Sequence, residues 1–330
     1  MKLEGMSAAE IQMKPEGATA APAKPGGVAT VAGGTVNAPE NARTRFFLKV
    51  QDGCANRCAY CVIPQVRGKP MSIPAVEVQA TAAKMVAAGY PELVVSGINA
   101  GVWHDGGMDL AGLMDWLARI DGLKRLRLSS IEVAGLTPEL LDVMERHQNI
   151  GRHLHLPLQS GDDRVLAAMG RRYDTNAFTA AVACARDAIP GVNLTTEVIV
   201  GFPGENEVAF NNTLWLVEDL GFSKIHVFTY SPRPGTVAAA MGDTVPAPVK
   251  KRRSRFLRLL SDRQQRVHRQ RKLGITSEIL LESPLAPGVH GGYSSDYTRF
   301  AVEGGDPGML VRVRGEEISG ETVRGKVISD

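Results

Sequence analysis

Cysteine is scarce in this chain of 330 residues, and its distribution limits the class of protein. Three of the four cysteines, Cys54, Cys58 and Cys61, lie within GCANRCAYC (53–61). The fourth, Cys184, lies in a helical pattern, where we expect it to be a small packing residue. Three adjacent thiols and one distant thiol cannot form an even set of disulfides, which excludes a disulfide-stapled secreted scaffold. Such a cluster usually binds metal in a reducing compartment, so we expect a cytoplasmic metal-binding protein.

Long apolar runs are also missing from the sequence. No segment approaches the roughly 18 to 20 consecutive apolar residues that a membrane helix needs, so no membrane association is expected. Residues 1–43 are rich in Ala, Gly and Pro but have neither the leucine-type apolar region nor the basic region of a signal peptide. We interpret residues 1–43 as a disordered leader.

An excess of positive charge is confined to one segment. Residues 248–273 hold 11 Lys and Arg against one Asp, whereas residues 44–247 hold 18 against 21 acidic residues and residues 274–330 hold 5 against 9. The pattern of residues 248–273 predicts a basic linker helix with the sparse apolar stripe Phe256, Leu259, Leu260 and Val267. A charged face can simply be solvated, but this density favours attraction to phosphate. The candidate RNA contacts in the segment are Lys250, Lys251, Arg252, Arg253 and Arg255.

Residues 44–247 alternate β-rich runs with amphipathic runs of helical length. The expected strands are 46–51, 93–98, 125–131, 153–159, 193–201 and 224–230. The expected helices between them are 74–89, 109–120, 137–147, 175–189 and 206–220. This alternation indicates an α/β fold with a parallel sheet, either doubly wound or a partial barrel. The barrel is favoured because nearly every strand ends in polar or glycine-rich residues, which is typical of loops that build a site at one rim.

Side-chain alternation predicts which strand faces are polar. In HLHLPLQ (153–159) a period of two puts three leucines on one face and His153, His155 and Gln159 on the other. The second face predicts a polar lumen in which the two histidines are hydrogen-bonded residues rather than metal ligands.

Residues 274–330 predict a second, smaller module. Four or five short β-rich runs are separated by glycine-rich turns, which suggests a small all-β barrel. Its acidic balance is not that of a nonspecific RNA binder, and its obvious base-stacking candidates are Tyr293, Tyr297 and Phe300.

Zinc and an iron–sulfur cluster are the realistic ligands for three close thiolates. Structural zinc normally takes four ligands, usually as two distant pairs, and the sequence has no second C-x2-C or H-x3-H pair. Three cysteines on one loop can instead hold three irons of a [4Fe-4S] cluster and leave the fourth iron open for a substrate or cofactor. We therefore expect an open cluster here, with zinc as the weaker alternative.

The motif C-x3-C-x2-C, with Tyr60 before its last cysteine, resembles the signature of the radical S-adenosylmethionine (SAM) superfamily. Over residues 44–247 the chain is similar to successive blocks of the tRNA methylthiotransferases: QDGCANRCAYCVIPQVRG, VVSGIN, RLSSIE, HLHLPLQSGDDRVLAAMGRRY, TEVIVGFPGE and HVFTYSPRPGTVAA. The block SGIN resembles the type that acts on threonylcarbamoyladenosine more than the GQNV form of the isopentenyladenosine enzymes. Residues 274–330 are similar, more weakly, to the TRAM RNA-binding module of these enzymes.

The resemblance implies a fold, an activity and a set of site residues. The fold is a partial (β/α)6 radical SAM barrel followed by a TRAM-like barrel, and the activity is methylthiolation at C2 of N6-threonylcarbamoyladenosine 37 in tRNA. Cys54, Cys58 and Cys61 would hold one [4Fe-4S] cluster whose open iron chelates SAM, and reductive cleavage of SAM would yield a 5′-deoxyadenosyl radical. Arg233, at a strand end, suits RNA phosphate. The residues expected beside the cofactors are Tyr60, Ser96, Gly97, Asn99, Glu132, Gln159, Arg171, Arg172 and Glu197.

The partners implied are tRNA and a low-potential electron donor such as flavodoxin or ferredoxin. Full-length enzymes of this kind begin with a domain whose three cysteines hold an auxiliary cluster implicated in supplying sulfur, whereas no cysteine precedes Cys54 here. Three hypotheses follow: a shortened or partial methylthiotransferase, with sulfur from a separate donor as one option; a single-cluster enzyme with other radical chemistry on RNA; or an RNA-binding relic. A related branch modifies a ribosomal protein, so that target also stays open.

Overall fold

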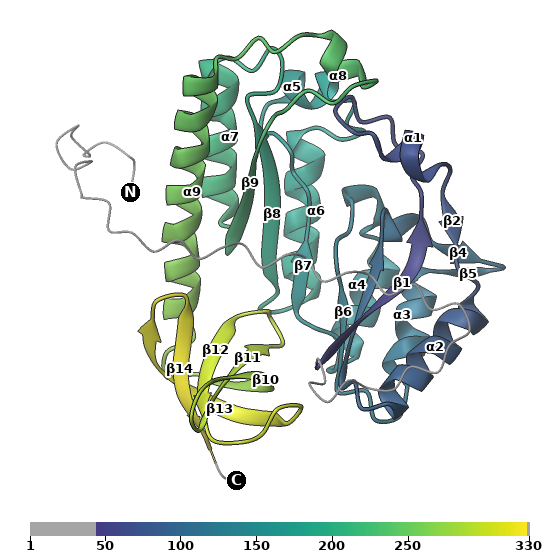
Figure 1. Cartoon of the computed structure of the whole chain (residues 1–330), viewed down its shortest axis with the longest axis vertical. Helices are drawn as coiled ribbons and strands as arrows, with labels where there is room; N and C mark the ends of the chain where they lie inside the picture. The colour runs from purple at the N-terminus through teal and green to yellow at the C-terminus, as the bar shows by residue number, and fades with distance from the viewer. Residues whose placement is uncertain (1–43, 329–330) are drawn as a thin grey trace. The chain divides into compact units, whose positions relative to one another are not determined.

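The computed structural model describes residues 44–328, and the leader expected over residues 1–43 lies outside this range (Figure 1). None of the helices in the described range is both long and apolar enough to span a membrane.

Six parallel strands within the described range form the expected core. They are β1 (Arg45–Asp52), β3 (Glu92–Gly97), β6 (Arg125–Leu128), β7 (His153–His155), β8 (Asn193–Val200) and β9 (Lys224–Thr229). One sheet has the order β2-β1-β3-β6, with the short antiparallel β2 (Met71–Ser72) at its edge, and the other has the order β7-β8-β9. Backbone hydrogen bonds join them beside β6 and β7, where Ile131 N donates to His155 O over 3.0 Å. The prediction of six strands at these positions is confirmed.

Five helices also lie where the sequence predicts them. They are α2 (Ala75–Ala87), α3 (Leu110–Ala118), α4 (Pro138–Arg146), α6 (Thr175–Ala188) and α7 (Glu207–Leu220). Asp109, Thr137 and Asn206 each accept a hydrogen bond from the first turn of the helix that follows, as N-cap residues do. Figure 1 shows α6 and α7 beside the β7-β8-β9 sheet and α2, α3 and α4 beside the other sheet.

Several shorter elements were not predicted. They are α1 (Ile63–Arg67), the 3-10 helices η1 (Ala100–Val102) and η2 (Val133–Gly135), the hairpin of β4 (His104–Asp105) and β5 (Met108–Asp109), α5 (Asp163–Ala168) and α8 (Val237–Ala240). Each is too short to show a clear hydrophobic period.

The core confirms the predicted alternation in HLHLPLQ. Leu154, Leu156 and Leu158 are fully buried against the helices. His153 and His155 face the opposite side and line a cavity between the strands. The face of β7 that lines the cavity is therefore polar, as expected.

The predicted basic helix is α9 (Ala247–Gln270), but its packed face was predicted wrongly. Three members of the expected apolar stripe are 44% to 54% exposed: Phe256, Leu259 and Val267. The buried residues of the helix are Lys250, Arg253, Ser254, Leu257 and Ser261.

Ion pairs explain why cations occupy this buried face. Arg253 Nη1 lies 2.7 Å from Glu205 Oε2, with both side chains at most 3% exposed. Lys250 pairs with Asp243 and donates to the backbone oxygen of Tyr230 over 3.3 Å. Burial of these charges is tolerated because each has an acidic partner.

The C-terminal module is a closed five-stranded barrel in the order β10-β11-β12-β14-β13. Its strands are β10 (Thr276–Ala286), β11 (Val289–Ser294), β12 (Arg299–Glu303), β13 (Leu310–Ser319) and β14 (Thr322–Val327). Phe300 is fully buried among Ile279, Leu281 and Val302. The prediction of a small β-barrel is confirmed, and Phe300 is not available for stacking on a base.

The sheets β2-β1-β3-β6 and β7-β8-β9 together are called the strand array below. A buried carboxylate at the start of β3 joins the strand array to the C-terminal barrel. Glu92 is fully buried, and its two oxygens lie 2.7 Å from Arg45 Nε and 3.1 Å from Arg127 Nε. Arg127 in turn donates to the backbone oxygens of Ser295 and Ser294 over 2.9 and 2.8 Å. Arg45 also pairs with Glu282, so removing Glu92 would leave the buried guanidinium of Arg127 without an acidic partner and Arg45 with only one of its two.

We expect the substitution Glu92→Gln to lower the free energy of unfolding by about 3–5 kcal/mol, the usual cost of breaking a buried ion pair. The control is Glu317→Gln, because Glu317 is 61% exposed and pairs with Arg324 over 3.1 Å at the surface. The control should cost at most about 1 kcal/mol. Urea denaturation of both variants provides the measurement, and equal losses would contradict a special role for Glu92.

Candidate active site at the cysteine loop

The cysteine loop, residues 53–61, leaves the end of β1 through a turn that only glycine can make. Gly53 has φ +70°, and a Cβ atom at this position would lie 2.1 Å from the backbone oxygen of Lys69. Cys54 N donates to Gly68 O over 3.1 Å. The first cysteine is thus tied to the chain that follows α1.

Gln51, which sequence reasoning missed, ties the loop to the end of β3. Its buried side-chain amide donates to the backbone oxygens of Asp52 and Gly53 over 2.6 and 2.7 Å, and its Oε1 accepts from Asn99 N over 2.8 Å. A Cβ atom on Gly97 would come within 3.0 Å of the Gln51 side chain. Gly97 and Asn99 therefore lie beside the loop, as expected, and a polar residue within a buried strand was the available signal for Gln51.

The other side of the loop rests on α5 and α8. Ala59 N donates to Met169 O and Ala59 O accepts from Ala238 N, both over 2.8 Å. Gly170 has φ +71°, and a Cβ atom there would lie 2.8 Å from the backbone oxygen of Arg57. Backbone contacts therefore fix the loop from several directions before any metal is considered.

The three thiols are half-buried and have polar neighbours. Cys54 Sγ accepts from Asn56 N and Cys58 Sγ accepts from Arg171 Nη1, both over 3.3 Å. Burial raises the pKa of the Cys61 thiol, the two neighbouring cysteines raise it further, and Arg233 opposes the shift. The fourth cysteine, Cys184, is exposed on α6, so the prediction that it packs was wrong.

Arg171 brings three predicted residues together. Its guanidinium pairs with Glu132 and lies 3.4 Å from the Tyr60 hydroxyl, in addition to its contact with Cys58. Its Nε donates to Tyr173 Oη over 3.0 Å. Arg172, by contrast, is exposed and makes no hydrogen bond or ion pair with residues 44–328. Only the first of the two predicted arginines reaches the cysteine loop.

The remaining candidates, at the ends of strands, make contacts in two places: Ser96 between β3 and β1, and Gln159 with Glu197 beside β8. Ser96 Oγ donates to Leu48 O over 3.3 Å, so this hydroxyl is used between β3 and β1. Gln159 Nε2 donates to Glu197 Oε1 over 2.5 Å, and His155 Nε2 lies 3.6 Å from Glu197 Oε2. Burial opposes ionisation of Glu197, but these two partners hold its pKa below the ordinary value.

The donor set of the loop fits an iron–sulfur cluster. Cysteine thiolates are the usual ligands of such clusters, and hydrogen bonds to their sulfurs are a normal part of the surrounding protein. In the described range, no group of three or more His, Cys, Asp or Glu side chains is placed to hold a single metal ion. Cys54, Cys58 and Cys61 would be the cluster ligands, and the Arg171 and Asn56 donors would lie against two of their sulfurs.

The candidate RNA contacts divide into two groups. Lys250 and Arg253 are 4% and 2% exposed and are used in internal ion pairs, so the expected phosphate contact does not fit them. Lys251, Arg252 and Arg255 are exposed on α9, where Arg252 also pairs with Glu207 over 2.7 Å. Arg233 is exposed on the loop after β9.

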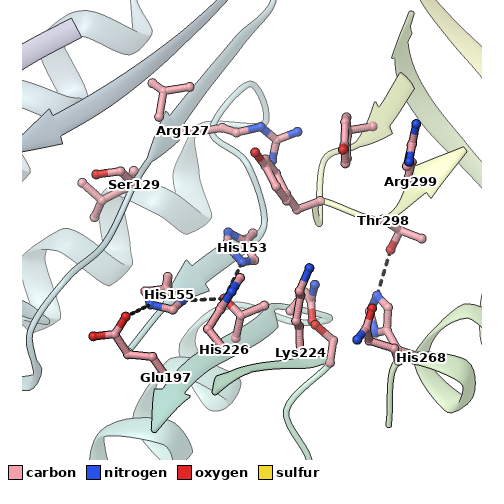
Figure 2. A pocket seen from close by; sticks show the side chains of 18 of the residues that line it. Arg127, Ser129, His153, His155, Glu197, Lys224, His226, His268, Thr298 and Arg299 are labelled. Atoms are coloured by element: carbon pink, nitrogen blue, oxygen red, sulfur yellow. Dashed lines mark hydrogen bonds and ion pairs between the residues drawn. The ribbon is translucent and has the colours of Figure 1, made fainter. Parts of the chain in front are cut away.

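A cavity of about 530 Å³ occupies the lumen of the strand array (Figure 2). His153 and His155 meet at the Thr195 hydroxyl, each over 2.9 Å. Figure 2 shows Glu197 and His226 beside His155, and Thr298 and Arg299 of the C-terminal module on the opposite wall. The lumen is thus lined by both modules, which the sequence did not predict.

The glycine at the start of the cysteine loop provides a test of this geometry. Gly53→Ala and Gly221→Ala both carry a cost of about 1–2 kcal/mol for a positive φ angle, since their φ angles are +70° and +62°. Only Gly53→Ala must also displace a backbone carbonyl, because no atom lies within 4 Å of a Cβ on Gly221. We expect Gly53→Ala to bind markedly less iron after reconstitution and to melt at a lower temperature than Gly221→Ala. Equal iron content and equal melting would contradict the close approach.

Comparisons with known proteins identify the family of this chain. Residues 48–217 match the radical SAM superfamily. The threonylcarbamoyladenosine tRNA methylthiotransferase MtaB of Thermotoga maritima is 38% identical over 85% of this chain and 65% of its own length. MtaB of Chlamydia pneumoniae is 36% identical over 87% of this chain and 68% of its own length. A tRNA-2-methylthio-N(6)-dimethylallyladenosine synthase of Cereibacter sphaeroides is 38% identical over 84% of this chain and 64% of its own length.

The chain spans 62% to 68% of the length of the MtaB relatives from Thermotoga maritima, Bacillus subtilis and Chlamydia pneumoniae. Among solved structures, the radical SAM methyltransferase TsrM of Kitasatospora setae is similar with a TM-score of 0.51 and 17% identity. That likeness covers 58% of this chain and 38% of TsrM, and it concerns the fold alone. From the superfamily match and the identity to these relatives, this chain belongs to the radical SAM superfamily and, within it, to the family of the MtaB-type tRNA methylthiotransferases.

Proposed function

We propose that this chain is a radical SAM enzyme that modifies tRNA by methylthiolation at C2 of N6-threonylcarbamoyladenosine 37. The observation that carries the proposal is the cysteine loop, in which the three thiols of the C-x3-C-x2-C motif share one segment fixed by Gln51, Met169 and Ala238. The similarity to MtaB relatives supports the choice of reaction and of modified nucleoside.

The cluster and SAM supply the radical chemistry when they are bound. The protein's part is to hold the thiolates and exclude water. Arg171 donates to Cys58 Sγ while its charge is balanced by Glu132, so the thiolate gains a hydrogen bond without an unpaired cation beside it. Around this pair, Tyr60 packs against a small apolar cluster that includes Phe202 and Met169. We assign cofactor contacts to Tyr60, Glu132 and Arg171 and to the strand-end residues Ser96, Gly97, Asn99, Gln159 and Glu197.

The RNA contacts in this proposal are the exposed cations near one end of the strand array and along α9. Arg233 lies close enough to Cys61 to influence its pKa, so a phosphate bound by Arg233 would lie near the cysteine loop. Lys251, Arg252 and Arg255 on α9 would bind phosphates further along the RNA. An electron donor of low potential and a source of sulfur, either of which can be a separate protein, complete the requirements of the reaction.

Anaerobic reconstitution with iron and sulfide, followed by reaction with reductant, SAM and tRNA that carries threonylcarbamoyladenosine, tests the proposal. We expect 5′-deoxyadenosine and a methylthio-nucleoside by mass spectrometry. Cys58→Ala should lose the brown absorbance and reduce deoxyadenosine formation to background, because only two of the three proposed cluster ligands remain. Cys184→Ala, at an exposed position of α6, should behave as the wild type.

Two outcomes of that experiment would contradict parts of the proposal. Deoxyadenosine formation by Cys58→Ala would reject the cluster assignment. Deoxyadenosine without a methylthio-nucleoside, even with a sulfur donor present, would favour a single-cluster enzyme with other chemistry on RNA.

The basic face of α9 gives a separate prediction about RNA binding. Arg255→Glu should weaken tRNA binding and reduce the slope of log K against log salt by about 1 or more, since a phosphate contact is replaced by repulsion. The control is Lys84→Glu, which makes the same change of charge at an exposed position of α2. A salt slope that is the same for both variants and the wild type would mean that the face of α9 is only solvated.

A further inference from the structure

The lumen cavity has an excess of positive side chains. Four cations, Arg127, Lys224, Arg269 and Arg299, and two carboxylates, Glu197 and Glu321, are among its lining residues. Arg127 is neutralised by Glu92, and Glu197 is held by Gln159 and His155. The side chains of Lys224 and Arg299 make no hydrogen bond or ion pair with other residues of the range 44–328. The cavity is therefore suited to a ligand that carries a negative charge.

Two of the four histidines that line the cavity, His153 and His226, do not add to this charge at neutral pH. Burial, with Arg127 nearby, lowers the pKa of His153 to about 3. Burial, with His155 and Lys224 nearby, lowers the pKa of His226 to about 4. These two rings are uncharged at neutral pH, so Lys224, Arg269 and Arg299 are the lining cations without an ion pair in the described range, against the single unpaired carboxylate of Glu321.

Two aromatic rings also line the cavity on the first and last strands of the array. Phe47 on β1 is 51% exposed and Phe228 on β9 is 52% exposed. Exposed rings of this kind can stack on a nucleic acid base. Lys224 and Phe228 are four residues apart on the same face of β9, which places them about 13 Å apart along the strand. A lysine side chain reaches several ångströms, so one ligand can contact both residues.

A purine with an anionic arm matches this combination. The threonylcarbamoyl group places a carboxylate, a hydroxyl and a urea on N6 of adenosine, whereas the dimethylallyl group at the same atom is uncharged and apolar. We propose that the cavity binds the modified adenosine with its purine against Phe228 and the threonylcarbamoyl carboxylate on Lys224 and Arg299. The proposal rests on the proposed function and deepens it, because these two cations select threonylcarbamoyladenosine against dimethylallyladenosine.

Stem-loop RNAs that differ only at one nucleotide test the selection. The RNAs carry adenosine, N6-threonylcarbamoyladenosine or N6-dimethylallyladenosine at the target position, and their binding to the full chain is measured by fluorescence anisotropy. We expect the wild type to prefer the threonylcarbamoyl RNA about tenfold or more, since hydrogen bonds to charged groups are the strong ones. Lys224→Met and Arg299→Met should each remove most of this preference and leave the affinity for the other two RNAs unchanged.

The control is Lys84→Met, which removes a lysine from α2, and the melting temperature of each variant verifies folding. If Lys224→Met weakens all three RNAs equally, Lys224 contacts phosphate and the proposal is overturned. An unchanged preference in both variants, or a wild type that prefers the dimethylallyl RNA, also overturns it. Free nucleosides as competitors provide a second measurement, because they contain no phosphate.

This experiment separates the inference from the proposed function. Binding requires neither SAM cleavage nor a sulfur source, so a chain that makes no methylthio product can still show the preference. Conversely, a chain that methylthiolates tRNA without a Lys224-dependent preference would retain the proposed function and lose the inference.

Discussion

The ion pairs of the buried carboxylate of Glu92 with Arg45 and Arg127 underlie the junction between the strand array and the C-terminal barrel. Arg127 holds two backbone carbonyls of the barrel and lies 4.5 Å from the Tyr297 ring, which in turn stacks on His153 with ring centres 5.0 Å apart. Arg45 also donates to the Tyr297 hydroxyl over 2.8 Å. One buried charge therefore connects barrel packing to the shape of the lumen.

Local patterns predicted the regular elements well, because strands and long helices carry their own hydrophobic period. The leucines of HLHLPLQ and the N-caps Asp109 and Asn206 were visible in short windows of sequence. The packed face of α9 was not, since its buried Arg253 depends on Glu205, which lies 48 residues earlier. A prediction that looks for an apolar stripe along a helix places such an arginine on the solvent-facing side. The arginine can be buried only because the distant Glu205 carboxylate balances its charge.

The same distinction applies to the candidate site. The three cysteines could be predicted because their spacing within one loop already limits what they can bind. Arg171 was predicted as a cofactor residue, but its contact with Cys58 spans 113 residues and depends on how α5 packs on the cysteine loop. Gln51 was missed although a polar residue within a buried strand was a signal, because that signal does not say which neighbouring loop the side chain holds. Tyr297, a base-stacking candidate, is 36% exposed, and its contacts with His153 and Arg127 at the junction of the two modules could not be predicted from a local pattern.

The hydrogen bond between Ala238 N and Ala59 O has a consequence for the order of events during synthesis. The cysteines are translated before the partners that complete their loop, because Met169 and Ala238 lie 110 and 179 residues after Ala59. A nascent chain that has exposed only β1 and α1 presents three thiols without this backbone support. The support of the cysteine loop is therefore complete only once residue 238 has been translated.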